Sequence, residues 1–335
     1  MSAIEIELAE ADVGKHLNFP APPRLISSLC SSWCIGAVTA AVQLGICLAE
    51  IYSCTQAGTF RHYVRRQRDQ RPTGPNHGGI RRVEFPEEFS ERAGTDCGRI
   101  GAGCARDLYK NGCHLALTYS KNKANVDSLI SELQSSSSQS DLKISSHQVD
   151  MASTEDMERL YKEIESQHGH GPDILIANAG YGKRVPQIVD ITYDEFDYTI
   201  LINLRAPFIL AKLAVPHMAQ QKWGRIIMMS SIAGYGGGIN GCHYAASKAG
   251  LTGMMRNLAN KLAKDGITVN DVAPAMIGET GMIPDAKFLE GTPGDVRNIP
   301  VGRLGTPQEC ANVVTMICRT GYLTGQSILL TGGLK

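Results

Sequence analysis

The fold is decided by the stretch GRIIMMSSIAGYGGGINGCHYAASKAGLTGMMRNLANKLAKDGITVNDVAP, residues 224–274. It contains a short segment that reads as a strand at 225–229, a segment of helical periodicity at 244–264 and a second segment that reads as a strand at 268–273. A strand, a helix and a strand in this order predict a βαβ unit whose two strands lie parallel.

The same alternation continues on both sides of this unit. Helices are predicted at about 101–110, 122–134, 154–167, 193–221 and 307–318, and strands at 113–119, 143–149, 173–177 and 327–330. The predicted fold class is therefore α/β, a Rossmann-type doubly wound parallel sheet flanked by helices. Such sheets bind ligands at the carboxyl ends of their strands, so we expect functional residues there.

The composition is that of an ordinary globular protein, with 335 residues, 43% hydrophobic content and 33 basic against 33 acidic side chains. Zero net charge gives no field for nucleic acid, so no nucleic-acid partner is predicted. The ten cysteines are scattered without paired metal-ligand spacing, and no secretory signal is visible. Reduced cysteines, no metal site and a cytoplasmic location are predicted.

Residues 1–98 lack the regular alternation of helical and strand periodicity that the rest of the chain shows. An atypical appendage is therefore predicted there, ahead of a catalytic domain at 99–335. Residues 25–49 carry no charged side chain and five arginines follow between 61 and 71, so a membrane helix with a basic flank is one interpretation. Serines dilute the stretch, which favours a poorly packed appendage instead. Residues 71–92, interrupted by proline and glycine, are predicted to be an irregular linker.

Tyr244 and Lys248 lie four residues apart in a predicted helix, which places them on one face. Tyr119 and Lys123 have the same spacing but nothing around them, so the spacing alone is not diagnostic. Tyr244 differs because it follows Ser231 by thirteen residues across a glycine-rich loop. This context predicts a catalytic group rather than a surface pair.

The three side chains suit the reduction of a carbonyl group. A tyrosine can protonate the forming alkoxide, and a nearby lysine stabilises its phenolate in the reverse direction. The Ser231 hydroxyl would orient the carbonyl oxygen. Asn203 lies inside the predicted helix 193–221, where its amide could hold a water for proton relay to Lys248.

Further motifs extend this pattern, namely Asn178-Ala179-Gly180 after a strand, NDVAP at 270–274, YLTGQ at 322–326 and the final Gly332-Gly333. With these motifs the chain resembles the classical short-chain dehydrogenase/reductase family over residues 98–335, and most of all its 3-oxoacyl-acyl-carrier-protein reductase branch. The resemblance implies a catalytic tetrad of Asn203, Ser231, Tyr244 and Lys248. It also implies cofactor contacts from Asp150 (to adenine), Asn178, Ala179, Gly180, Tyr244, Lys248, Pro274, Ala275 and Ile277, and a homodimer or homotetramer.

The beginning of the family pattern is damaged. Ile100 and Gly101 match the end of the glycine-rich phosphate turn, but Arg99 stands at the position of its middle glycine. Residues 84–92 are too charged for a central parallel strand, so the first strand and turn are predicted to be degraded or replaced. Either the turn is a real variant with altered cofactor binding, or a misassigned exon boundary supplies residues before 99.

The residues after the second predicted strand indicate the cofactor. An acidic residue there would select NAD, but this chain has Ser120 and Lys121, which can hydrogen-bond and neutralise an extra phosphate. The prediction is NADPH and the reductive direction.

The predicted reaction reduces a ketone, most suitably a 3-oxoacyl thioester of fatty-acid synthesis, with acyl carrier protein as a partner that Lys222 and Lys264 could contact. Residues 276–298 are predicted to form a substrate lid, and Tyr181 and Arg184 its edge. Two other functions remain open: a cofactor-deficient homologue that binds or supports a partner, and a membrane-tethered reductase of lipids or sterols.

Overall fold

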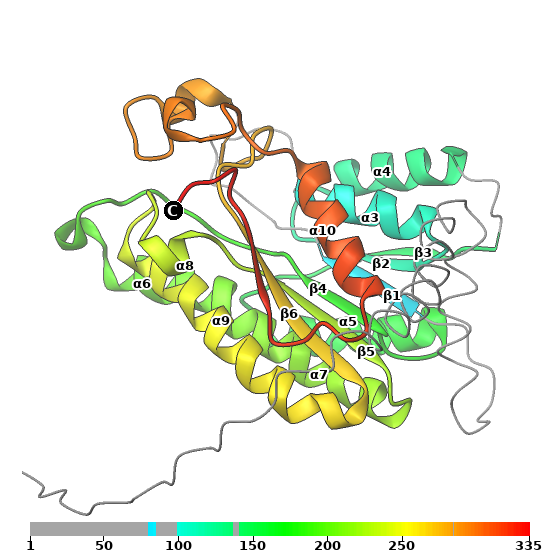
Figure 1. Cartoon of the computed structure of the whole chain (residues 1–335). Helices are drawn as coiled ribbons and strands as arrows, with labels where there is room; N and C mark the ends of the chain where they lie inside the picture. Colours follow the sequence, from blue (N-terminus) through cyan, green and yellow to red (C-terminus); the bar gives the residue numbers. More distant parts are fainter. Residues whose placement is uncertain (1–79, 85–98, 137–140, 284) are drawn as a thin grey trace, which may run out of the picture. The chain divides into compact units, whose positions relative to one another are not determined.

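The computed structural model describes residues 80–84, 99–136, 141–283 and 285–335. They form a single seven-stranded parallel sheet in the order β3-β2-β1-β4-β5-β6-β7 (Figure 1). The strands are β1 Ile80–Glu84, β2 His114–Tyr119, β3 Ile144–Gln148, β4 Ile174–Ala177, β5 Gly224–Met229, β6 Ile267–Pro274 and β7 Ser327–Leu330. This order confirms the predicted doubly wound α/β fold.

Helices cover both faces of the sheet (Figure 1). Residues of α5 Thr154–His168, α7 Ala206–Gln220 and α9 Cys242–Leu262 form one buried apolar layer with the strands. The opposite layer contains residues of α3 Arg99–Lys110, α4 Lys123–Ser136 and α10 Pro307–Arg319. Alternate strand residues belong to alternate layers, as a sheet buried on both sides requires: Ile226 packs in the first and Ile227 in the second.

The central strand corrects the sequence prediction. β1 Ile80–Glu84 pairs with β2 from Ile80↔His114 to Glu84↔Thr118, and with β4 at Arg81↔Ile174. The predicted irregular linker at 71–92 is therefore wrong for these five residues, and the sheet begins upstream of the predicted domain boundary at 99. Its backbone pairs with both neighbours, and ladder hydrogen bonds do not depend on side-chain type. The rest of the predicted appendage and the glycine turn at 94–98 lie outside the described residues.

The predicted long helix at 193–221 is divided in three. It consists of α6 Tyr193–Ile200, a π-helical turn Leu201–Arg205 and α7. The described part of the chain has one helical stretch long and apolar enough to cross a membrane, Tyr193–Gln220, and half of its apolar window is buried within the protein. Residues 25–49, where the sequence suggested a membrane helix, lie outside the described residues.

The smaller elements lie around the carboxyl end of the sheet. They are η1 Ile188–Asp190, α8 Ala233–Gly236 after β5, and η4 Ala286–Leu289 and η5 Val296–Asn298 between β6 and α10; η3 Ala263–Asp265 instead precedes β6. The strand order reverses between β1 and β4, so the loops after β4, β5 and β6 meet beside this switch point.

Candidate active site

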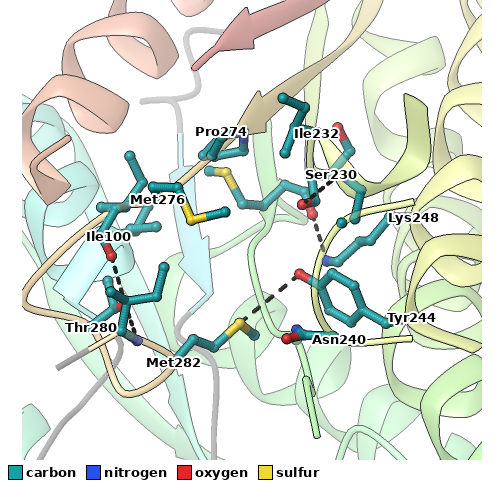
Figure 2. Close-up of a pocket in the computed structure, with 18 of the residues that line it drawn as sticks. Ile100, Ser230, Ile232, Asn240, Tyr244, Lys248, Pro274, Met276, Thr280 and Met282 are labelled. Atoms are coloured by element: carbon teal, nitrogen blue, oxygen red, sulfur yellow. Dashed lines mark hydrogen bonds between the residues drawn. The ribbon is translucent and has the colours of Figure 1, made fainter. Parts of the chain in front are cut away.

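A pocket opens at the carboxyl ends of β4, β5 and β6, where the topology predicts a ligand site. Its walls come from these strand ends, from α9 and from the segment after β6 (Figure 2). The lining includes the predicted residues Ile100, Asn178, Gly180, Ser231, Tyr244, Lys248, Pro274, Ala275 and Ile277. Most of the residues chosen from the sequence therefore converge on one cavity.

Tyr244 lies in the first turn of α9 and is almost completely buried. Its hydroxyl oxygen lies 4.0 Å from Sδ of Met282, which reaches in from the segment after β6 (Figure 2). Burial raises the pKa of Tyr244 to about 12, and a hydrogen bond from Ser231 acts against this rise. The neutral, proton-carrying form of the tyrosine is thus strongly favoured at neutral pH.

Lys248 lies one turn further along α9 and only 3% of it is exposed. Its ammonium donates a 2.9 Å hydrogen bond to the carbonyl oxygen of Met229 and lies 5.7 Å from the centre of the Tyr244 ring. Burial lowers the pKa of Lys248 to about 8, while the negative charge of Asp271 raises it. A cation of this kind next to a tyrosine is the arrangement that stabilises a phenolate.

Ser231 is the second residue after β5. Its Oγ accepts a 3.2 Å hydrogen bond from the backbone N–H of Ala233, which fixes the side chain at the start of α8. The neighbouring Ser230 also lines the pocket, but its hydroxyl donates to Asp271 and to the carbonyl oxygen of Val272. Ser231, the residue chosen by its spacing from Tyr244, is thus the serine whose hydroxyl acts on the pKa of that tyrosine.

Asn203 lies in the π-helical turn, a type of distortion that often marks functional sites. Its Oδ1 accepts from the N–H of Tyr181 at 2.7 Å, and its Nδ2 donates to the Tyr181 carbonyl oxygen and to Ser247 Oγ. Asn203 is fully buried and does not line the pocket. Its hydrogen bonds hold the loop after β4 against α9. Sequence reasoning placed it in a regular helix, because the π turn keeps the apolar pattern of an α-helix.

The residues at the end of β4 fit a dinucleotide. Nδ2 of Asn178 is buried without a hydrogen-bond partner, although the residue lines the pocket. A Cβ on Gly180 would lie 3.4 Å from the Lys248 ammonium, so this glycine borders the space next to the lysine. A polar ligand at this position could accept a hydrogen bond from the unpartnered Asn178 amide.

Other predicted cofactor residues lie away from this pocket. Gly101 and Ala179 are buried beside it without lining it. Ser120 follows β2, and its carbonyl oxygen accepts from Gln148, while the exposed Lys121 lies next to it. Asp150 follows β3, and its Oδ1 accepts a 2.8 Å hydrogen bond from the N–H of Ala152. All of them except Gly101 follow strand ends on the same edge of the sheet, as an extended ligand would need.

Only the first part of the predicted lid segment lines the pocket. Met276, Met282 and Ile283 line the pocket, together with Thr280 and Gly281 of the same segment. Phe288 and Leu289 do not line it: Phe288 is half exposed and Leu289 is completely buried in η4. Met229, Ile232, Ile239 and Asn240 also line the pocket, and their proximity to Tyr244 follows only from the folded loop after β5.

Two further pairs of predicted residues are placed elsewhere. Tyr181 and Arg184 are absent from the lining, and the Tyr181 hydroxyl donates instead to Glu195 at 3.2 Å. Lys222 and Lys264 precede β5 and β6, so they lie at the amino end of the sheet, opposite the pocket. Lys222 is paired there with Asp265 at 2.5 Å. These lysines cannot guide a carrier protein to the pocket, and that expectation is wrong.

A cluster of potential metal ligands contrasts with the prediction of no metal site. Ligand atoms of His170, Asp173 and His217 lie within 4.8 Å of one another. His217 Nε2 is 3.0 Å from Asp173 Oδ1, and the two imidazole rings stack. The cluster lies at the amino end of β4, remote from Asn178 at its carboxyl end, and we assign it no step of the chemistry.

Comparisons with known proteins identify the family. A family model described as enoyl-(acyl carrier protein) reductase matches residues 98–335. The chain is 36% identical over 239 residues to 3-oxoacyl-acyl-carrier-protein reductase FabG of Rickettsia bellii, covering 71% of this chain and 92% of the relative. It is 31% identical over 236 residues to human dehydrogenase/reductase SDR family member 4, covering 70% and 83%.

Solved structures agree with this assignment. A dehydrogenase/reductase from Sinorhizobium meliloti aligns with a TM-score of 0.65 at 29% identity, over 78% of this chain and 96% of the other. A mutant short-chain dehydrogenase/reductase from Serratia marcescens gives the same TM-score at 26% identity, over 78% and 99%. With the parallel sheet, the Tyr244–Lys248 pair and these matches together, the chain belongs to the short-chain dehydrogenase/reductase family of NAD(P)-dependent oxidoreductases.

Proposed function

We propose that this protein is an NADPH-dependent carbonyl reductase that converts a ketone, most suitably a 3-oxoacyl thioester, to the alcohol. The observation that carries the proposal is the convergence of the Tyr244 hydroxyl, the Ser231 hydroxyl and the Lys248 ammonium on one pocket that also contains the unpartnered Asn178 amide. NADPH bound along the strand ends would supply the hydride.

The protein's own groups then handle the oxygen of the substrate. Ser231 holds the carbonyl oxygen by a hydrogen bond, and Tyr244 transfers its hydroxyl proton to that oxygen as negative charge develops there. Lys248 stabilises the phenolate left behind. Asn203 contributes by fixing the Tyr181 backbone and Ser247, so its role is positioning rather than direct contact.

The lining favours an apolar substrate. Met229, Met276 and Met282 meet in the pocket with Ile232 and Ile283. Methionine side chains are flexible and polarizable, so they adapt to chains of different shape. This supports an acyl group as the variable part of the substrate, while acyl carrier protein and fatty-acid synthesis remain proposals based on the FabG relative.

Ser120 and Lys121 support NADPH over NADH. They directly follow β2, at the position where a carboxylate would favour NADH. A hydroxyl and an ammonium can bind the phosphate that distinguishes NADPH. A cytoplasmic location remains part of this proposal.

We propose further that the chain forms a homodimer through the two long helical segments around 193–221 and 242–265, which are α6, α7 and α9. Large apolar side chains are exposed on η1, α6 and α7, with Tyr193 91% and Phe208 50% accessible. Several large apolar side chains exposed on successive elements are typical of a protein–protein interface. A tetramer would use the edge strand β7, where Leu329 is also exposed.

The full chain tests this function in two steps. NADPH fluorescence titration should saturate, and acetoacetyl-coenzyme A should then be reduced with consumption of one NADPH per ketone. Absence of saturable NADPH binding would reject the enzyme in favour of a cofactor-deficient homologue. Saturable binding without reduction of acetoacetyl-coenzyme A, but with reduction of simple ketones, would reject the thioester substrate alone. Recovery of activity only with membranes would favour the tethered reductase.

A further inference from the structure

A buried carboxylate lies behind the active site and has no part in the chemistry described so far. Asp271 belongs to β6 and none of its surface is exposed. Its Oδ1 accepts a 2.7 Å hydrogen bond from the Ser230 hydroxyl, and its Oδ2 accepts a 3.1 Å hydrogen bond from Thr252 Oγ1. The Ser327 hydroxyl also donates to Oδ1, and Tyr235 donates to Ser327.

The three hydroxyl groups come from three different elements. Ser230 follows β5, Thr252 lies on α9 and Ser327 begins β7, so the carboxylate joins the two strands next to β6 and the helix that carries the tyrosine. Burying a carboxylate is costly unless hydrogen bonds replace its water. Both oxygens of Asp271 accept hydrogen bonds from hydroxyl groups, and these bonds replace the water that burial removes.

The partners of Asp271 are neighbours of the catalytic groups. Ser230 immediately precedes Ser231, and Thr252 lies one helical turn after Lys248 on the same face of α9. The Met229 carbonyl, just before Ser230, accepts the hydrogen bond of the Lys248 ammonium. The spacing between Ser231 and the Tyr244–Lys248 pair therefore depends on the same junction that Asp271 holds together.

The charges around this junction are few. From α9, Lys248 interacts electrostatically with Asp271, and Tyr244 lies one turn before Lys248 on the same helix. From α8, Tyr235 reaches the carboxylate through Ser327. Arg225 of β5 is directed elsewhere, since it donates to the carbonyl oxygen of Cys318 on α10. Among the described residues, Lys248 is the cation that the structure couples to this carboxylate.

We propose that Asp271 is a positioning residue for this reaction: it ties the end of β5 to α9 and sets a fixed negative charge within electrostatic reach of Lys248. The inference rests on the proposed carbonyl reduction for its meaning, but the coupling of the two charges can be measured without any turnover. Because a carboxylate favours the ammonium form of a lysine, removing its charge must make Lys248 lose its proton at lower pH.

The test is an NMR titration of Lys248 in the full chain without ligands. The Cε signal of Lys248 is identified by its loss in Lys248→Met and followed with pH in the wild type and in Asp271→Asn, which keeps the shape but not the charge. We expect the midpoint to fall by about one unit or more in Asp271→Asn, equivalent to about a tenfold loss of the ammonium form above the midpoint. An unchanged midpoint would overturn the proposal.

Thr252→Val is the matched control, because it removes one hydrogen bond to Asp271 and leaves its charge. We expect it to keep the wild-type midpoint; an equal fall in both variants would show that packing rather than charge is responsible, against the proposal. If Asp271→Asn does not fold, Asp271→Val is titrated in its place, because it also removes the charge and brings no unpaired donor into the buried site. The Lys248 midpoint should fall in the same way, and an unchanged midpoint would again overturn the proposal.

Activity gives a separate readout. If NADPH-dependent reduction is established for the wild type, Asp271→Asn should lower kcat more than it raises KM, and its pH profile should shift toward acid relative to Thr252→Val. If the wild type reduces nothing, the proposed function fails while the titration still decides the role of Asp271. A normal pH profile in Asp271→Asn with a lowered Lys248 midpoint would contradict a positioning role in the reaction.

Discussion

The ammonium of Lys248 donates a hydrogen bond of 2.9 Å to the carbonyl oxygen of Met229, the last residue of β5. This bond connects the helix that carries Tyr244 to the strand that ends just before Ser231. A lysine buried to this extent needs such a partner, because nothing else would offset the free-energy cost of removing its charge from water. The same bond therefore stabilises a buried cation and sets the distance between the groups of the site.

Replacing Tyr244 with Phe should abolish most of the reductase activity. The change removes one hydroxyl group and little packing, so the fold should persist while the proton donor is lost. We expect kcat to fall by more than about 10²-fold, the lower range for a positioned general acid. The measurement is NADPH oxidation with acetoacetyl-coenzyme A, with circular dichroism to check the fold.

The chain provides a control for this variant. Tyr119 and Lys123 repeat the spacing of the catalytic pair, but Lys123 is engaged with Asp127 at 2.8 Å and Tyr119 ends β2 away from the pocket. Tyr119→Phe should leave turnover nearly unchanged. Equal activity of the two tyrosine variants and the wild type would show that the site has been misidentified.

Lys248→Met should change the pH dependence of stability. Burial lowers the pKa of Lys248 to about 8, below the ordinary value near 10.4, so between these values the unfolded chain binds a proton that the folded chain does not. The wild-type free energy of unfolding should therefore rise with pH in this window, by up to about 1.4 kcal/mol per pH unit, relative to the variant. Urea denaturation of both proteins from pH 7 to 10 measures it; parallel curves would mean that Lys248 titrates normally.

Lys121→Glu should weaken NADPH binding and spare NADH. The substitution places a negative charge where the extra phosphate is expected, and losing a charge-assisted hydrogen bond costs about 1.5–3 kcal/mol, or more than about tenfold in Kd. Fluorescence titration with both nucleotides measures the preference. Lys123→Ala, two residues on and tied to Asp127, is the control and should keep the wild-type ratio. A Lys121→Glu protein that still prefers NADPH would place the phosphate elsewhere.

Met282→Ala should shift the substrate preference toward bulkier ketones. Sδ of Met282 lies 4.0 Å from the Tyr244 hydroxyl oxygen, so shortening this side chain opens space next to the proton donor. We expect the ratio of kcat/KM between a branched and a linear 3-oxoacyl thioester to rise about four- to fifteenfold, which is the contribution of one or two methylene groups. Phe288→Ala, in the same segment but outside the pocket, should not alter that ratio; an equal effect of both would argue against direct contact with Met282.

Phe208→Glu should convert the proposed dimer to monomers. Phe208 is half exposed on α7, and a charge placed in an apolar interface would be left without water or a partner. Sedimentation equilibrium at micromolar concentration measures the mass. Met316→Glu, on α10 across the sheet and similarly exposed, should leave the mass unchanged. A monomeric wild type would contradict the dimer altogether.

The repeating pattern of the fold and the central residues of the site could be predicted from the order of the amino acids alone. Helical and strand periodicities are local properties, so the predicted elements after residue 99 agree with the observed ones to within a few residues, as α9 and β6 do. The spacing of four between Tyr244 and Lys248 likewise fixes a shared helix face before any tertiary contact forms.

Features that depend on pairing between distant parts of the chain could not be predicted in this way. β1 Ile80–Glu84 lacks the apolar pattern of a central strand and is defined by backbone bonds to β2 and β4. Asn203 acquires its partners through a π turn, and Asp271 acquires three hydroxyls from elements that are far apart in the chain. The reason is physical: local periodicity shows which face of an element is buried, but a hydrogen-bond partner from another element is known only when the chain has folded.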